Sequence, residues 1–120
     1  MKQYLYRVRP GYGSKRLLIE FSDSPDNKDF SEALKNLFKA CEIETVKKEK
    51  SFDDVLYSLA SNYGFFEMSV DSWGGVFIHA DDNQVVIGYL DKQLTGSGVF
   101  KKEVVDFSQY ESEQGFKGRS

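Results

Sequence analysis

The chain has 120 residues, 40% of them hydrophobic and 29% charged, with a formal net charge of −3 at pH 7. This length predicts one domain, and eighteen aromatic side chains favour a core that needs neither a disulfide nor a metal. The composition excludes disordered and fibrous classes, and no apolar run approaches the roughly 20 residues of a membrane-spanning helix.

Two strands are predicted at the start of the chain, because side-chain character alternates in residues 3–9 and again in residues 15–22. Residues 10–14 contain Pro and two Gly, which is typical of a turn, so the two strands form a hairpin. One face of this hairpin is mainly apolar. The other is basic and carries Arg7, Arg9 and Arg16.

Two helices are expected next. Apolar residues at spacings of three and four form a stripe from Phe30 to Cys41, with Asp29 as the expected N-cap. Residues 44–50 have the composition of a charged linker. A second stripe, from Phe52 to Tyr63, follows a variant capping box and predicts another helix that Gly64 ends.

A period of two returns from residue 65 and predicts a meander of three strands, at 65–71, 76–80 and 84–90. A loop over 92–98 follows, and residues 99–107 fit either an edge strand or a partial helix. The sequence therefore predicts a single α+β domain over residues 1–110 with a flexible tail at 111–120. Its expected order is ββ-α-α-βββ-β, an antiparallel sheet of five to six strands with two helices packed on one face.

Charge is distributed unevenly along the chain. Residues 51–91 contain seven Asp or Glu and no Lys or Arg, whereas residues 1–19 contain five Lys or Arg and no acid. In the meander, strand alternation places Phe66, Met68 and Val70 toward the helices and puts a mixed acidic and aromatic set on the opposite face. Apolar anchors surrounded by carboxylates are suited to docking on a basic protein.

The preferred hypothesis is therefore a small, non-enzymatic, cytoplasmic protein-binding domain, such as an inhibitor or immunity-type protein that neutralises a basic toxin or nuclease. The single cysteine favours the cytoplasmic location. The candidate partner-binding residues lie in or beside the meander: Glu67, Asp71, Trp73, Phe77, His79, Asp81 and Asp82. Trp73, on a glycine-flanked turn, is the expected hot spot or else a cover for the core.

Two alternatives stay open. The basic hairpin face, with Arg7, Arg9 and Arg16, could contact phosphates, although the sequence pI near 5.2 disfavours nucleic-acid binding. A small enzyme with a pocket between the helices and the sheet is the third possibility. One His and one Cys are too few for the usual zinc site, and the sequence predicts no metal, no cofactor and no catalytic residue.

Overall fold

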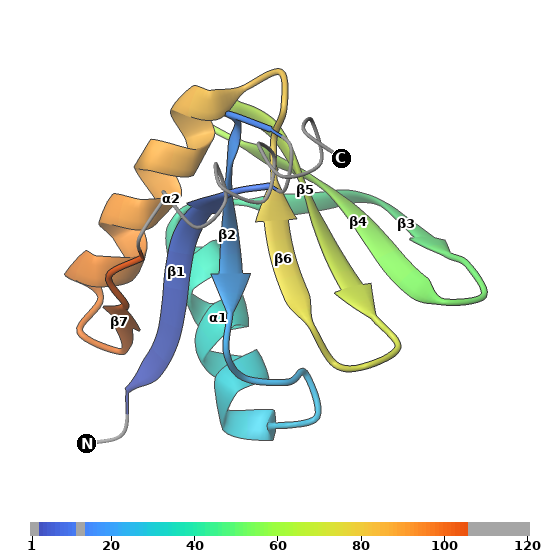
Figure 1. Cartoon of the computed structure of the whole chain (residues 1–120), viewed down its shortest axis with the longest axis horizontal. Coiled ribbons are helices and arrows are strands. Elements are labelled where there is room, and N and C mark those ends of the chain that lie inside the picture. The colour runs from blue at the N-terminus through green and yellow to red at the C-terminus, as the bar shows by residue number, and fades with distance from the viewer. Residues whose placement is uncertain (1–2, 12–13, 106–120) are drawn as a thin grey trace, which may run out of the picture.

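A seven-stranded mixed sheet with two helices on one face forms the structure, a computed structural model that describes residues 3–11 and 14–105 (Figure 1). Along the chain the elements are β1 (Tyr4–Pro10), β2 (Leu17–Phe21), α1 (Lys28–Ala40), β3 (Glu44–Lys50), β4 (Asp54–Ser61), β5 (Gly64–Asp71), β6 (Val76–His79), α2 (Gln84–Gly96) and β7 (Phe100–Lys102). Across the sheet the order is β3-β4-β5-β6-β2-β1-β7. Within the described residues no helix is long and apolar enough to span a bilayer.

The core lies on the sheet face that both helices cover. Val8, Ile19 and Ile78 are register neighbours on β1, β2 and β6, so their side chains fall on the same face. Phe30 of α1 and Ile87 of α2 are also buried in this cluster. The α+β class and the presence of two helices are therefore confirmed, whereas the sheet is larger than expected and is not wholly antiparallel.

The predicted helix over residues 30–41 is confirmed as α1, but its N-cap is Asn27 and not Asp29. The Asn27 Oδ1 atom accepts hydrogen bonds from the backbone N–H groups of Asp29 and Phe30 at 3.1 and 3.2 Å. Cys41, the only cysteine of the chain, is buried at the C-terminal end of the helix. The following residue, Glu42, has a φ of 57°, which takes the chain out of the helix.

The prediction of a charged linker and a second helix over residues 44–64 is wrong, because these residues form the β3–β4 hairpin. Val55 and Leu59 belong to the predicted helical stripe, and together with Tyr57 they also recur with a period of two on one face of a strand. The charges of residues 44–50 suit β3 because it is an edge strand, and exposed charges discourage further strand pairing.

The predicted strand at 84–90 and the predicted loop at 92–98 are also wrong, since these residues form most of α2. The helix buries Val86, Ile87, Leu90 and Leu94, a stripe with helical spacing that continues past the end of the predicted strand. The β-branched residues at its start suggest a strand, but tertiary burial of this stripe outweighs their modest local preference.

The sequence of residues 99–107 fits either a strand or a partial helix, and the structure has a short strand, β7, at 100–102. This strand pairs in parallel with β1, so that Phe100 lies opposite Tyr4. The parallel pair is possible because α2 carries the chain back across the sheet before β7 begins. Residues 106–107 and the predicted tail at 111–120 lie outside the described residues.

A buried tyrosine joins α2 to the sheet. The Tyr6 hydroxyl donates a 2.7 Å hydrogen bond to Asp91 Oδ1, and Asp91 Oδ2 lies 2.8 Å from Lys102 Nζ of β7. Burial and the contact with Asp91 raise the pKa of the Tyr6 hydroxyl above its ordinary value. Burial, followed by a hydrogen bond with Cys41, raises the pKa of Tyr89 to about 12.

These shifts predict an alkaline loss of stability. Above about pH 10 an unfolded tyrosine releases its proton, whereas folded Tyr6 retains it, so the free energy of unfolding falls as the pH rises. Urea unfolding at several pH values between about 8 and 11 should show a shallower slope for Tyr6→Phe than for the wild type. Part of the pH dependence should remain in that variant, because the pKa of Tyr89 is also raised. Identical slopes in the two proteins would contradict the prediction.

Candidate functional site

Four of the predicted partner-binding residues come together at one end of β5 and β6. Glu67 and His79 are direct register partners, and the Glu67 Oε1 atom lies 3.7 Å from His79 Nδ1. With Asp81, Asp82 and Phe65 they line a shallow pocket of about 500 Å³. We call these five residues the acidic pocket. Phe65 is 69% exposed, and Asp81 and Asp82 are also exposed, so the pocket combines an apolar ring with accessible carboxylates.

Asn83 holds the loop that carries Asp81 and Asp82 against the β4–β5 hairpin. Its Nδ2 atom donates to the carbonyl oxygens of Tyr63 and Phe65 at 2.9 and 3.1 Å. Gly64 makes this contact possible, because its φ is +104° and a Cβ there would lie 2.7 Å from the Asn83 Nδ2 atom. The sequence suggested Gly64 as a helix terminator, and in the structure it belongs to the β4–β5 hairpin.

Replacing Gly64 with alanine should therefore disturb the acidic pocket. The left-handed backbone conformation costs an L-residue about 1–2 kcal/mol, and the added methyl group displaces the Asn83 amide. We expect a lower free energy of unfolding by urea, together with changes in the amide NMR shifts of residues 80–83. Gly88→Ala is the control, because a Cβ at this helical position meets no atom within 4 Å. Unchanged shifts at residues 80–83 would show that Asn83 does not depend on Gly64.

Asp71 and Trp73 lie at the other end of β5, away from the acidic pocket. Asp71 and Glu67 are four residues apart on one strand, which corresponds to about 13 Å. The Asp71 Oδ1 atom accepts hydrogen bonds from the N–H groups of Trp73 and Gly75, at 3.0 and 2.7 Å, and so shapes the β5–β6 turn. The Trp73 side chain is 88% exposed and does not cover the core.

Phe77 is half-buried and lies between the two ends of the strands, opposite Ser69 and Glu20.

The remaining acids of residues 51–91 do not extend the acidic pocket. Asp53 and Asp54 lie at the β3–β4 turn, and Asp54 is the register partner of Asp71. Asp91 is engaged by Lys102 and Tyr6. Six of the seven carboxylates therefore divide into two groups at opposite ends of β5. In the described part of the chain Asp91, on α2, alone among the seven has a lysine or arginine within ion-pair distance.

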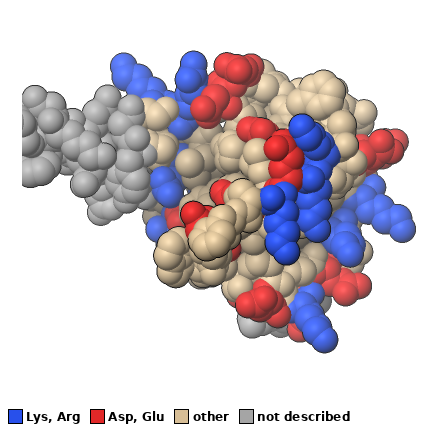
Figure 2. Space-filling model, turned by 90° about the vertical axis from the view of Figure 1, so that its right-hand side faces the viewer, with Lys and Arg blue, Asp and Glu red and all other residues tan. Residues whose placement is uncertain are grey.

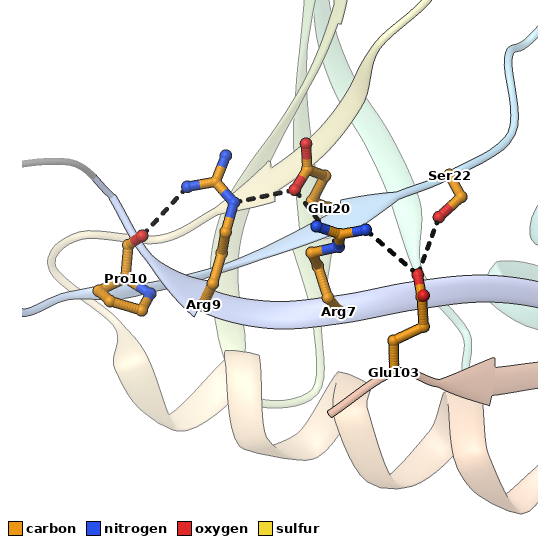
Figure 3. A network of polar contacts seen from close by, with 6 residues as sticks. All are labelled: Arg7, Arg9, Pro10, Glu20, Ser22 and Glu103. Atoms are coloured by element: carbon orange, nitrogen blue, oxygen red, sulfur yellow. Dashed lines mark hydrogen bonds and ion pairs between the residues drawn. The ribbon is translucent and has the colours of Figure 1, made fainter. Parts of the chain in front are cut away.

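The basic face of the first hairpin forms an internal ionic network (Figure 3). The Arg9 Nε atom donates to Glu20 Oε1 at 2.9 Å, and Arg7 lies between Glu20 and Glu103, at 3.7 and 3.3 Å. The Arg9 side chain is only 10% exposed. Arg16 is exposed and has no carboxylate of the described residues within ion-pair distance. Two of the three predicted phosphate-binding arginines therefore neutralise carboxylates of the same sheet face.

A second concavity lies between α1 and the β4–β6 part of the sheet, where the third sequence hypothesis expected a pocket. Its volume is about 400 Å³, and most of its lining is apolar. The sequence analysis did not predict its rim, which contains Lys35, Lys39 and Thr45. Thr45 lies beside the two lysines only because residues 44–50 form a strand and not a linker. The helical spacing of the two lysines was the available signal.

Comparisons with protein-family models, with curated proteins and with solved structures find no match to this chain.

Proposed function

We propose that the chain is a small, non-enzymatic protein-binding domain, of the inhibitor or immunity type, that docks on a basic partner protein through the acidic pocket. The observation that carries this proposal is the convergence of three carboxylates, Glu67, Asp81 and Asp82, around the exposed ring of Phe65. An exposed aromatic ring with charges around it has the composition of an anchor and its rim in protein interfaces.

The charge of the pocket is available to a partner. In the described residues neither Asp81 nor Asp82 has a cationic group within ion-pair distance, and Glu67 has only His79. Carboxylates held on one surface attract a basic partner from a distance and exclude acidic proteins. The Asn83 hydrogen bonds hold the acidic loop in place before binding, which reduces the entropy that docking has to overcome.

Reversing the two loop charges should slow association. A partner captured from a native lysate and purified should bind Asp81→Lys/Asp82→Lys at least about tenfold more slowly than the wild type at low salt, with a smaller salt dependence. Phe65→Ala should mainly raise the dissociation rate, because it removes the apolar anchor. Surface plasmon resonance at several ionic strengths measures both rates.

The matched control is Asp26→Lys/Asp53→Lys, which changes the net charge by the same amount. Both residues are exposed and lie near the turns at the opposite end of the strands. Association of the control should stay within about twofold of the wild type at physiological salt, where distant charges are screened. Equal slowing by both double variants, or a partner that is itself acidic, would refute docking through the acidic pocket.

A further inference from the structure

The concavity between α1 and the sheet is an apolar groove whose rim is basic. Ten of its fourteen lining residues are apolar, and they include Phe30, Phe38, Tyr57, Met68 and Val70. The four remaining lining residues are Ser31, Lys35, Lys39 and Thr45, so every charged group in the lining is a cation.

The groove exists because α1 crosses the sheet obliquely. Phe30, near the start of α1, packs its ring against Tyr4 and Phe100 at the β1–β7 side, whereas Phe38, near its end, packs against Phe66 of β5. Strands β3 and β4 extend past the helix, as the right-hand side of Figure 1 shows. Tyr57, Met68 and Val70 face the helix side yet remain only partly buried.

Lysines approach the groove from two elements. Lys35 and Lys39 are one helical turn apart on α1, and within the described residues neither has a carboxylate within ion-pair distance. On β3, the Lys48 Nζ atom lies 5.6 Å from the centre of the Tyr57 ring, which places a third cation beside the lining. Figure 2, which views the molecule from the β3 side, shows lysine or arginine side chains interspersed with acidic ones on this side of the molecule.

We propose that this groove binds an amphipathic small-molecule anion, a free alkyl carboxylate, with its chain along the apolar floor and its carboxylate at Lys35 and Lys39. A volume of about 400 Å³ lies within the usual range for small-ligand sites, roughly 300–1,000 Å³. Mostly apolar walls with a few charged groups at the edge are the composition of such sites. The site is separate from the acidic pocket, because the two have no lining residue in common.

Titration with dodecanoate tests the proposal. Methyl NMR spectra of the full chain should show saturable shifts at Leu59, Met68 and Val70 below the micelle concentration of the ligand. Dodecyltrimethylammonium, which has the same chain and the opposite charge, should bind more weakly by about tenfold or more, since a charge-assisted contact is replaced by repulsion.

Lysine variants separate the contribution of the ligand's carboxylate from that of its alkyl chain. Lys35→Gln/Lys39→Gln should weaken dodecanoate binding about tenfold and leave the binding of uncharged dodecanol within twofold. Lys92→Gln/Lys101→Gln is the matched control, because it removes two exposed lysines of α2 and β7 that do not line the groove. All four positions are exposed, so each variant is expected to fold.

Several results would overturn the proposal. They are no saturable dodecanoate binding, shifts confined to residues outside the groove, equal affinity for the cationic and anionic ligands, and equal weakening by the two lysine pairs. Tighter binding of an acidic amphipathic peptide than of dodecanoate would also overturn it in favour of a protein ligand. None of these outcomes depends on the acidic pocket, so the two proposals stand or fall separately.

Discussion

Replacing Phe30 with alanine is expected to lower the free energy of unfolding by about 3–5 kcal/mol, the range for truncating a buried aromatic side chain. Phe30 is 1% exposed. Its ring centre lies 5.8 Å from that of Tyr4, 5.5 Å from that of Phe21 and 6.3 Å from that of Phe100. Truncation therefore removes the side chain on which β1, β2 and β7 converge and leaves a cavity under α1.

Phe52→Ala is the matched control for this prediction. It removes the same atoms from a side chain that is fully exposed at the β3–β4 turn, so the expected change is within about 0.5 kcal/mol. Urea unfolding followed by circular dichroism measures both variants. Similar losses in the two proteins would show that Phe30 is not part of a packed core.

Replacing Glu20 with glutamine should cost about 3 kcal/mol, at the lower end of the range for breaking a buried ion pair. Glu20 Oε1 accepts a hydrogen bond from Arg9 and forms an ion pair with Arg7, and the Arg9 side chain is only 10% exposed. Glutamine keeps the size of the side chain and removes its charge, so the loss reports the cost of leaving a buried guanidinium without its carboxylate. The hydrogen bond from Arg9 to the Pro10 carbonyl oxygen compensates only in part.

The control is Glu49→Gln, which breaks the ion pair with Lys47 on β3. Both side chains of that pair are more than half exposed, so the expected loss is below about 1 kcal/mol. The two variants are compared by urea unfolding at low and high salt. A Glu20→Gln variant as stable as Glu49→Gln would show that the arginine network contributes little to folding.

The confirmed sequence predictions concern segments in which local pattern and burial agree. Alternation in residues 65–71 and 76–80 predicts both strands and which of their side chains face the helices, as Met68 and Ile78 show. The stripe of α1 is equally unambiguous, because Phe30 and Leu34 are buried at helical spacing and polar residues fill the opposite side.

The wrong predictions concern segments whose residues fit two periods. In β4, Val55, Leu56 and Leu59 have helical spacing, but the strand presents its two faces to different environments and only Leu59 is fully buried. In α2, a run of β-branched residues resembles a strand until Leu90 and Leu94 extend the stripe. Only the tertiary pairing of β3 with β4, and the need for a crossover before β7, decides between the two periods.

The residue types of the candidate site were predictable from the sequence, but the separation of these residues into two groups at opposite ends of β5 was not. Sequence alternation places Glu67 and His79 on one face, and the turn that follows β6 brings Asp81 and Asp82 beside them. Asp71 belongs to the same strand face, yet the length of β5 separates it from the others. The groove was not predictable, because its lining requires the correct path of residues 44–61.

The parallel pairing of β1 with β7 means that the sheet cannot be completed until late in synthesis. Tyr4 pairs with Phe100, so during synthesis the outer edge of the first strand has no hydrogen-bonding neighbour until nearly all described residues have left the ribosome. Such distant pairing is slow to form. A nascent chain that stops before residue 100 therefore exposes one unpaired edge of the N-terminal strand to other chains, which makes intermolecular strand association its main hazard.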